Sequence, residues 1–368
     1  MTRLRVGILG AGTIAQVEHI PNLLALRDMF EVAGVVDPSA AVRDFIGRTY
    51  DIPTFETFDA LLAAAKLDAI VIALPDSLHR GAVLAGLAHD LHVFCEKPLC
   101  YSPEEIAEII AVRDRAKKVV QVGYMKRFDP AYRHALAMMP ENSESLRQIS
   151  VEVIDPDAAP FIQHHRTRFS SDVPARLIEE AGTLRKAQIE AAIGRQLTDL
   201  AFRGFAGPYS SSIVHDVNAI HGLLEAMHVD DGEIVGADIF ANGAGGFGAV
   251  SLLGGQVLWT MSHLTLPSLA DYRERITLYF EDRSVELEFP SPYLNHQPTR
   301  LTIRRSDGFV LSATDHRESY AEAFVEEMKG FWAAMVNGDP VVNTPEHAAR
   351  DMRLLVGLTR HYLERRTR

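Results

Sequence analysis

The run Gly10-Ala11-Gly12-Thr13-Ile14-Ala15 follows an apolar segment, residues 4–9, and opens a helical pattern that continues to Arg27. A strand, a glycine turn and a helix in this order are typical of a dinucleotide-binding unit. We expect Gly10 to permit the tight turn and Gly12 to let the backbone approach a pyrophosphate. Ala15 would let helix and strand pack closely, with the helix N-terminus facing the phosphates. The stretch predicts a Rossmann domain.

A carboxylate ends the next predicted strand. Residues 31–36 are apolar except at the first position, and Asp37 follows them at about the interval after the glycines that the dinucleotide fingerprint expects. A carboxylate there accepts hydrogen bonds from both adenosine ribose hydroxyls and repels a 2′-phosphate. This favours NAD over NADP. The alternative is a generic strand-turn-helix unit.

Strand and helix patterns then alternate up to residue 125. Beyond Asp37, the predicted strands are 67–74, 91–95 and 119–125, and the predicted helices are 59–65, 77–89 and 103–117. Such alternation predicts a parallel, doubly wound sheet. Ligands of these sheets bind beyond the carboxyl ends of the strands. Four residues fall at such ends: Gly10, Asp37, Pro75 and Lys97.

Glu96, Lys97 and Pro98 follow one of these strands directly. A buried ammonium is costly unless it is paired, and proline fixes the exit from the strand. The chain has 37 basic residues, of which seven are lysine and therefore 30 are arginine. A lysine retained here suggests a need for a compact, titratable ammonium. The alternative is a surface Glu–Lys pair before a turn.

Composition restricts the class of protein. A chain of 368 residues fits two domains, and a net charge of -12 with no basic block argues against nucleic-acid binding. No apolar run approaches 18 residues, so we expect no membrane helix. The first residues show no signal-peptide pattern. Cys95 and Cys100 are predicted to be reduced packing residues, which together with these features predicts a cytoplasmic protein.

The pattern changes after about residue 125. We predict a strand at 147–154, irregular structure at 155–168, a helical stretch at 172–202 interrupted near Gly182, a helix at 210–227, successive strands from 232 to 310, and helices at 318–337 and 345–366. This order predicts an α+β domain with a mostly antiparallel sheet. The predicted domains are 1–125 for cofactor binding, 126–345 for substrate and oligomerisation, and a closing C-terminal helix at 346–368.

With these residues considered together, the chain resembles the glucose-fructose oxidoreductase, inositol dehydrogenase and MocA (Gfo/Idh/MocA) family of NAD(P)-dependent oxidoreductases. The resemblance covers nearly the whole chain. It rests on the glycine motif, Pro75 with His79, Glu96-Lys97-Pro98, the run from Gln121 to Tyr132, and His215-Asp216-Val217-Asn218.

The resemblance implies a Rossmann domain, a second domain with a large open sheet, and sugar or polyol substrates. Lys97 would lie between nicotinamide and substrate with His215 opposite, and the Lys97–Pro98 peptide would be cis. The implied cofactor residues are Gly10, Gly12, Thr13, Ile14, Asp37, Leu74, Pro75, His79, Glu96 and Lys97. The implied substrate residues are Lys97, Met125, Lys126, Ser211 and His215, and no metal ligands are expected.

The implied chemistry is hydride transfer from a carbinol carbon. His215 has a suitable pKa range for the proton, and Lys97 would stabilise developing alkoxide charge.

Two positions depart from the family pattern. Many members carry an aspartate four residues before the histidine, where this chain has Ser211. A serine cannot orient or charge the histidine as a carboxylate would. Asp216, Asp199 or Tyr209 could contribute instead, and the sequence does not choose among them. The second departure is Asp76, where the family often has asparagine, near the expected nicotinamide ribose.

The segment 155–205 is longer than the family minimum. Its stretch 161–169 mixes basic and aromatic residues, which suits either a lid that recognises sugar hydroxyls or a carboxylate, or a solvated loop. His164 and His165 lack a further ligand at metal-binding spacing.

The sequence therefore predicts an NAD-dependent dehydrogenase of a sugar, polyol or related cyclic hydroxyl compound. Two alternatives stay open: a redox-neutral lyase or glycosidase with tightly bound NAD, and a non-enzymatic NAD-binding regulator. We also expect a homodimer or homotetramer, because apolar residues alternate in 276–280 and 285–289 and would leave one sheet face exposed.

Overall fold

The computed structural model describes residues 2–366, which divide into two compact units interleaved along the chain. The first unit comprises the chain up to Tyr124 with residues 162–192 and 324–350. The second comprises 125–161, 193–323 and the chain from Asp351. The consecutive ranges 1–125, 126–345 and 346–368 stay a prediction for the domains. Residues 1, 367 and 368, at the ends of those ranges, lie outside the described residues.

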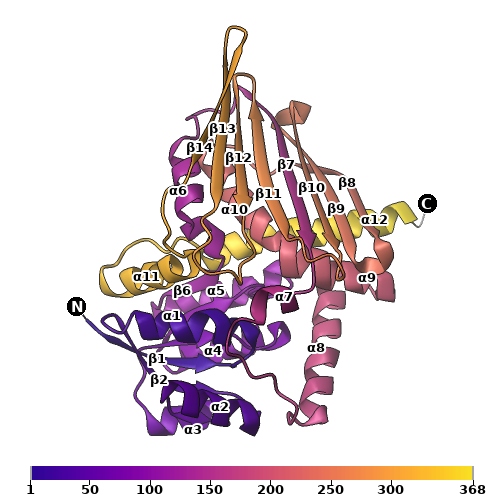
Figure 1. The fold of residues 1–368 in the computed structure, drawn as a ribbon. Helices are drawn as coiled ribbons and strands as arrows, with labels where there is room; N and C mark the ends of the chain where they lie inside the picture. Colours follow the sequence, from indigo (N-terminus) through magenta and orange to yellow (C-terminus); the bar gives the residue numbers. More distant parts are fainter. Residues whose placement is uncertain (1, 367–368) are drawn as a thin grey trace. The chain divides into compact units, whose positions relative to one another are not determined.

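The first unit contains a parallel sheet with the strand order β3-β2-β1-β4-β5-β6 (Figure 1). This confirms the predicted doubly wound Rossmann architecture, in which the order reverses between β1 and β4. The strands are β1 (Leu4–Leu9), β2 (Phe30–Val36), β3 (Thr54–Phe55), β4 (Ala69–Ile72), β5 (His92–Glu96) and β6 (Val120–Gly123).

Helices of the first unit follow the strands in turn. They are the π-helical turn η1 (Ala15–His19), α1 (Ile20–Ala25), α2 (Ala40–Tyr50), α3 (Phe58–Ala64), the 3₁₀ turn η2 (Asp76–Leu78), α4 (His79–Ala88) and α5 (Pro103–Ala116). Side chains of Ser39, Thr57 and Ser102 cap α2, α3 and α5 by accepting an amide hydrogen bond. Helix α11 (Ala323–Val336) packs Met328, Phe331 and Trp332 into the core of this unit, which explains why a late segment joins it.

The predicted interruption at Gly182 is wrong, because helix α8 (Ala175–Ile193) continues unbroken through that glycine. A Cβ at Gly182 would meet no neighbour. The break falls at Gly194, whose φ of +85° suits a glycine, and α9 (Asp199–Gly204) follows. The contacts that hold α8 come from three positions on one side of it, Ala181, Arg185 and Gln188.

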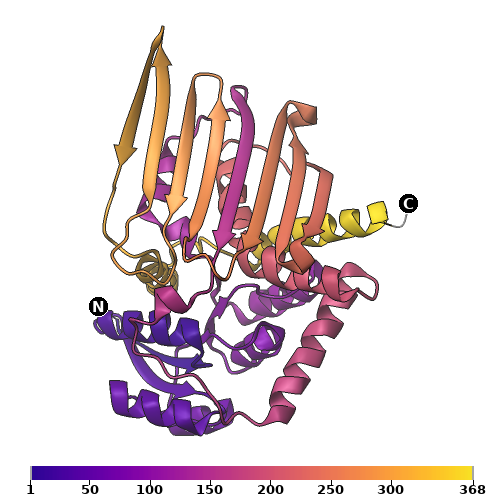
Figure 2. The ribbon, with the colours of Figure 1, turned by 45° about the vertical axis from the view of Figure 1, so that its right-hand side comes forward.

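The second unit contains an eight-stranded sheet with the order β14-β13-β12-β11-β7-β10-β9-β8 (Figures 1 and 2). Only β7 and β10 pair in parallel, so the predicted mostly antiparallel sheet is confirmed. The strands are β7 (Leu146–Asp155), β8 (Glu233–Phe240), β9 (Gly245–Leu252), β10 (Val257–Thr265), β11 (Arg273–Phe280), β12 (Arg283–Phe289), β13 (Arg300–Asp307) and β14 (Val310–His316). The short α7 (Ala159–Ile162) interrupts the segment predicted to be irregular.

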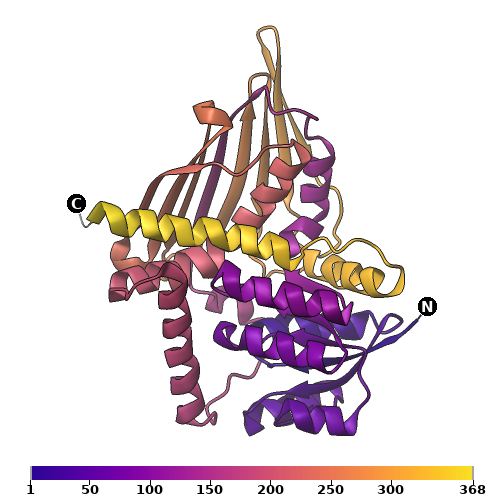
Figure 3. The ribbon, with the colours of Figure 1, turned by 180° about the vertical axis from the view of Figure 1, so that it is seen from behind.

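One face of this sheet is covered by α6 (Pro130–Ala137), α10 (Val214–Ala226) and the part of α12 (Pro345–Arg366) that begins at Asp351 (Figure 3). Ile276, Leu278, Val285 and Leu287 point to the covered face and are fully buried. The reason given above for an oligomer is therefore wrong, because these apolar positions are not exposed. A pocket on the sheet is lined mainly by polar side chains, among them Ser150, Glu152, Thr260, Ser262, Arg275 and Thr277.

The helix predicted at 210–227 begins differently from a regular α-helix. Residues Phe205–Ile213 form a π-helical segment, η4, which leads directly into α10. A second non-α turn, the 3₁₀ segment η3 (Met125–Phe128), precedes α6. Among residues 2–366, no helix is both long enough and apolar enough to cross a membrane.

Candidate functional site

The glycine turn after β1 has the geometry that the sequence predicts. Gly10 has a φ of +92°, and a Cβ there would lie 2.5 Å from the carbonyl oxygen of Ala73, so only glycine fits. A Cβ on the exposed Gly12, by contrast, would meet no atom within 4 Å. Ala15 is fully buried where the helix meets the sheet. The turn therefore leaves open space at Gly12, beside the first helical amides at Thr13 and Ile14, as a pyrophosphate would require.

Asp37 is held in place at the end of β2. Its Oδ2 accepts a hydrogen bond of 3.0 Å from the Ala11 amide, and its Oδ1 accepts one of 2.9 Å from the Ser39 amide. The carboxylate thus connects the glycine turn to the start of α2. Each carboxylate oxygen can accept a further hydrogen bond, so the fixed group remains able to accept ribose hydroxyls.

Lys97 leaves β5 through a cis peptide to Pro98, which confirms the predicted cis bond. The residue is half-buried, and its amide donates to Glu96 Oε2 at 3.2 Å. Glu96 is buried, with Oε1 2.8 Å from His19 Nε2. Burial favours its neutral form, but the hydrogen bond with His19 and the charges of His19 and Lys97 lower the pKa of Glu96. The Glu96 carboxylate is therefore held next to Lys97.

His79 ties two strand ends together. Its Nε2 lies 2.9 Å from the carbonyl oxygen of Leu74, and its Nδ1 lies 2.8 Å from that of Pro98. The side chain is buried. His79 was predicted to bind cofactor, and the structure gives it a positioning contact between the ends of β4 and β5, where Pro75 is exposed and Leu74 half-buried.

The departure at Asp76 has a physical explanation in helix α8. Asp76 Oδ2 pairs with the guanidinium of Arg185 at 2.9 Å, and Arg185 Nε donates to the Tyr101 hydroxyl at 3.0 Å. Ser77 Oγ donates to the Ala181 carbonyl at 3.0 Å, and Gln188 Nε2 donates to the Ser77 carbonyl at 3.1 Å. The three α8 positions are spaced by four and three residues, so one helix face contacts the end of β4. An asparagine at position 76 would lack the negative charge that pairs with Arg185.

The second unit has a buried charged cluster around Lys126. Its Nζ lies 2.9 Å from Asp216 Oδ1 and also contacts Glu274 Oε1, while Tyr272 donates to Glu274 Oε2 at 2.8 Å. All three charged side chains are at most 5% exposed. Met125, the preceding residue, is buried as well. Lys126 was predicted to contact substrate, and the structure gives its ammonium internal partners; the substrate contact stays a prediction.

The pKa values of Asp216 and Lys126 are both raised in this cluster. Burial, and next the charge of Glu274, raise the pKa of Asp216 to about 8. Burial alone would lower the pKa of Lys126, but the two carboxyl groups outweigh it and the pKa is raised. The cluster therefore favours the neutral form of Asp216 beside the Lys126 ammonium.

The structure distinguishes the three groups proposed to replace the missing aspartate. The Tyr209 hydroxyl lies 2.7 Å from the Phe247 carbonyl oxygen and 3.0 Å from that of Asp238, so backbone acceptors hold its proton. Asp199 is exposed in the first turn of α9. Asp216 directly follows His215 in α10, and its buried carboxyl group contacts Lys126. Neighbouring residues of a helix do not face each other, so which of the three groups supports His215 stays a prediction.

Ser211 and His215 do not share one regular α-helical face. Ser211 lies in the π-helical segment η4, and His215 lies in the first turn of α10. In a π-helix the bonding runs from i to i+5, so the four-residue alignment assumed from the sequence is changed. Ser211 is exposed and His215 is half-buried. Lys97 belongs to the first unit and His215 to the second, so their expected apposition stays a prediction.

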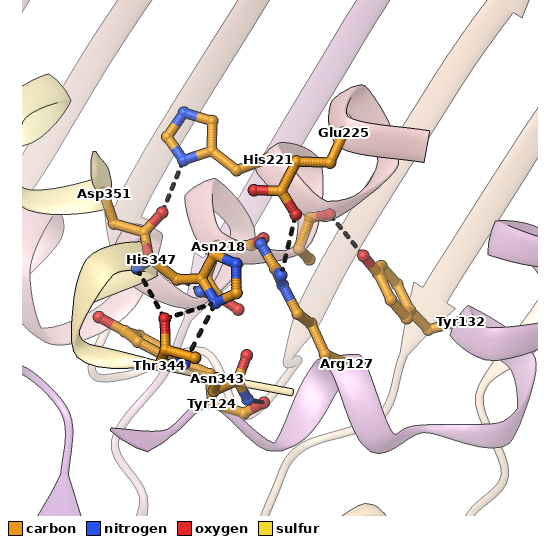
Figure 4. A network of polar contacts seen from close by, with 11 residues as sticks. Tyr124, Arg127, Tyr132, Asn218, His221, Glu225, Asn343, Thr344, His347 and Asp351 are labelled. Carbon is orange, nitrogen blue, oxygen red and sulfur yellow. Dashed lines mark hydrogen bonds and ion pairs between the residues drawn. The ribbon is translucent and has the colours of Figure 1, made fainter. Parts of the chain in front are cut away.

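Helix α10 is fixed by polar contacts that the sequence did not indicate (Figure 4). Asp351 of α12 accepts from Asn218 Nδ2 at 2.8 Å and lies 2.6 Å from His221 Nδ1. On the other side, Arg127 Nη2 and Nε donate to the Asn218 carbonyl at 2.8 and 3.0 Å, and Tyr132 donates to the Ala219 carbonyl at 2.8 Å. These contacts set the position of the helix that carries His215.

One group in the described part of the chain has the composition of a metal site. His134, His316 and Glu318 bring their ligand atoms within 4.8 Å of one another. His134 Nδ1 lies 3.0 Å from Glu318 Oε1, so a hydrogen-bonded pair accounts for the contact without an ion. The absence of a metal in the proposed reaction stays a prediction.

The match to a family model covers the first unit's sheet. Residues 4–124 match the oxidoreductase family GFO_IDH_MocA with an NAD-binding Rossmann fold. This stretch is a Gfo/Idh/MocA NAD-binding domain. The rhizopine catabolism protein MocA of Rhizobium meliloti is 37% identical over 130 residues, which are 35% of this chain and 40% of that protein.

Two further comparisons extend this result. An inositol 2-dehydrogenase of Corynebacterium glutamicum is 31% identical over 146 residues, 39% of this chain and 42% of that protein. The chain thus matches about two fifths of the length of these curated relatives. The solved UDP-N-acetylglucosamine 3-dehydrogenase GnnA from Acidithiobacillus ferrooxidans covers 98% of both chains with a TM-score of 0.69 and 18% identity, a likeness in fold.

Proposed function

We propose that this protein is an NAD-dependent oxidoreductase that transfers a hydride between a sugar, polyol or related cyclic hydroxyl compound and the nicotinamide. The observation that carries the proposal is the open space at Gly12 beside the fixed Asp37 carboxylate. The substrate class is supported by the matching relative that is named as an inositol 2-dehydrogenase.

The cofactor residues fit this role on geometry. The amides near Thr13 and Ile14 would bind the pyrophosphate, and Asp37 would accept the adenosine ribose hydroxyls. Leu74, Pro75 and the Glu96–Lys97 pair follow β4 and β5, at the carboxyl edge where this fold binds its ligand. His79 would act by holding those two strand ends.

Lys97 and His215 would carry the chemistry of this chain. When bound, NAD supplies the hydride acceptor. The Lys97 ammonium would stabilise negative charge on the substrate oxygen as its proton leaves, and His215 would receive that proton. Glu96, ionised behind Lys97, favours the ammonium form. Met125, Lys126 and Ser211 would line or support the substrate position.

A substrate screen tests the activity. The purified protein is supplied with NAD and a panel of sugars, polyols and uronic acids, and the NADH absorbance band is followed. We expect at least one compound to give NADH in amounts equal to the oxidised product. Product formed with catalytic NAD and no net NADH would support the redox-neutral alternative instead.

Binding titrations test the cofactor. By NADH and NADPH fluorescence, we expect at least a tenfold preference for NADH, equivalent to roughly 1.4 kcal/mol. Asp37→Ser should narrow that preference by removing the negative charge. Equal or tighter NADPH binding by the unaltered protein would contradict the choice of NAD.

The proposed assembly is a homodimer or homotetramer. With the apolar positions of β11 and β12 buried, the support is the width of the eight-stranded sheet, whose pocket is lined by residues of β7, β9, β10, β11 and β12. Light scattering at micromolar concentration should give a mass of at least two chains. A monomer mass would contradict this part of the proposal.

A further inference from the structure

Residues 162–192 form a segment, here called the strap, that runs along the carboxyl edge of the first unit's sheet and ends in α8 (Figures 1 and 2). At its start, Gln16 Nε2 donates to the Arg168 carbonyl at 2.9 Å, and the Arg168 amide donates to Gln16 Oε1 at 2.7 Å. At its end, α8 contacts the turn after β4 through Ser77 and Asp76. The strap therefore passes the ends of β1, β2 and β4.

Between these two attachments, Asp172 reaches the start of α2. Its Oδ1 accepts a hydrogen bond from the Ser39 hydroxyl, and its Oδ2 accepts one of 3.0 Å from the Ala41 amide. Ser39 Oγ itself accepts the Val42 amide at 3.1 Å, as the cap of α2. The hydrogen bonds from Ser39 and Ala41 lower the pKa of Asp172, so the group is an anion at neutral pH. A carboxylate thus occupies the positive end of this helix.

The same donors are those that a phosphate on the adenosine ribose would need. Asp37, expected to accept the ribose hydroxyls, receives the Ser39 amide at 2.9 Å, so Ser39 lies between the two carboxylates. An arginine near this position commonly accommodates the 2′-phosphate of NADP. Here Arg43 Nη1 donates to the carbonyl oxygens of Asp37 and Pro38 at 2.7 and 3.0 Å, and Arg43 Nη2 lies 3.7 Å from Glu56.

We propose that Asp172 determines the specificity for NAD over NADP. Its carboxylate, which belongs to the chain itself, occupies the hydrogen-bond donors at the start of α2 and so excludes the 2′-phosphate of NADP. This inference rests on the proposed NAD function. Asp37 alone would repel a phosphate through one charge. Asp172 adds a second charge and leaves the Ser39 hydroxyl and Ala41 amide already bonded. Asp172 lies 135 positions after Asp37, so a sequence motif around β2 does not contain this determinant of cofactor specificity.

Two mononucleotides isolate the effect without any catalysis. Isothermal titration of 5′-AMP and adenosine 2′,5′-bisphosphate gives, as a ratio of dissociation constants, the discrimination against the 2′-phosphate. For the unaltered protein we expect at least tenfold weaker binding of the bisphosphate. Asp172→Ala should reduce that ratio at least about fivefold and change 5′-AMP affinity by less than twofold. Asp172→Lys, which adds a positive charge, should reduce it further.

A matched control separates specificity from attachment of the strap. Gln188→Ala removes the α8 contact to Ser77 without touching α2, and it should leave the ratio unchanged. Asp172→Asn keeps the shape if Asp172→Ala lowers stability, and it should also reduce the ratio, because it removes the charge. An unchanged ratio in all Asp172 variants, or an equal loss of affinity for both nucleotides, would overturn the inference and leave Asp172 as a helix cap.

The result for the unaltered protein separates the proposed NAD preference from the proposed role of Asp172. If it already binds the bisphosphate as tightly as 5′-AMP, the proposed NAD preference fails and this inference fails with it. If it discriminates, and Asp172→Ala and Asp172→Lys discriminate equally well, only the role of Asp172 is wrong.

Discussion

The carboxyl edge of the first unit and the Lys126 cluster of the second unit are built in opposite ways. At the edge, the groups proposed to meet a ligand are backbone amides, one half-buried carboxylate and one half-buried lysine, all close to strand ends. In the cluster, a lysine pairs with two carboxyl groups, one of which accepts from Tyr272, and the ammonium also lies over the Phe289 ring. The three charged residues come from positions up to 148 residues apart. The edge is open and the cluster is closed.

The difference assigns different tasks to the same residue types. A charge that meets a ligand changes binding and rate when it is removed, whereas a charge enclosed with its counter-charges changes folding stability. Lys97 and Lys126 therefore form a pair of tests. The same substitution at each position should affect different measurements.

Lys126→Met should have the largest effect, and it should be on stability. It leaves the buried Asp216 and Glu274 carboxyl groups without their cation, and breaking a buried pair in this way typically costs about 3–5 kcal/mol. The chain has two tryptophans, Trp259 on β10 of the second unit and Trp332 on α11 of the first. In a Trp332→Phe background, the fluorescence of Trp259 during urea unfolding reports the second unit.

The matched control is Lys97→Met in the same background, which should shift the Trp259 transition by less than about 1 kcal/mol, as expected for a substitution outside a buried network. If the two variants lowered the unfolding free energy equally, the closed cluster would not be the stabilising one, and the contrast between the two regions would fail.

Lys97→Met should have the next largest effect, and it should be on rate. Removing one electrostatic group that acts on the developing alkoxide should lower kcat at least about a hundredfold, near 2.7 kcal/mol. NAD affinity should change by less than tenfold, because the interaction grows in the transition state. Single-turnover formation of NADH on the best substrate of the screen measures it.

His215→Ala should cause similar damage, and the double variant should lose much less than the product of the two single losses if both groups serve one proton transfer. Near-normal turnover of Lys97→Met would show that the proposed mechanism is wrong.

The stability of the second unit should also fall as the pH rises. Burial, followed by the charge of Glu274, raises the pKa of Asp216 in the folded protein from 3.8 to about 8. Between those values the folded chain holds a proton that the unfolded chain releases. The unfolding free energy therefore declines through this window, with a slope of up to about 1.4 kcal/mol per pH unit, and levels off above it.

Trp259-monitored urea unfolding from pH 5.5 to 8.5 measures this decline. Asp216→Asn carries no titrating proton at this position and should give a flatter profile. Parallel profiles for the two proteins would mean that Asp216 does not hold the proton.

The sheet of the first unit could be predicted from the sequence because its constraints lie within short stretches. The φ of Gly10 needs a glycine at one position of a turn, and the proline after Lys97 marks the end of β5. Asp37 follows β2 directly. Such signals depend on neighbouring residues, so a single sequence displays them.

Other features could not be predicted because tertiary contacts decide them. Glycine in a helix interior costs roughly 1 kcal/mol, which favoured a break at Gly182. Helix α8 continues because Ala181, Arg185 and Gln188 on one face bond to the turn after β4. In the same way, nothing near Lys126 in the sequence indicates Glu274.

The apolar positions of β11 and β12 could be recognised as one sheet face, but not as the covered one. Periodicity gives the side on which Ile276 and Leu287 lie, and the helices α6, α10 and α12 decide which side is buried.

Ser211→Ala should have the smallest effect, and it tests whether this serine takes part in the proton transfer assigned to His215. Ser211 is exposed in the π-helical segment, whose hydrogen bonding from i to i+5 differs from that of the regular helix expected before His215. We expect kcat within about threefold of the unaltered protein. This is far below the 10²–10⁴-fold contribution that is typical of a proton-transfer group. The pH profile of kcat should keep its shape, because His215, the proposed proton acceptor, is unchanged. If Ser211→Ala instead proves as damaging as His215→Ala, the serine has replaced the carboxylate in function. The relay would then run through Ser211 as well as His215.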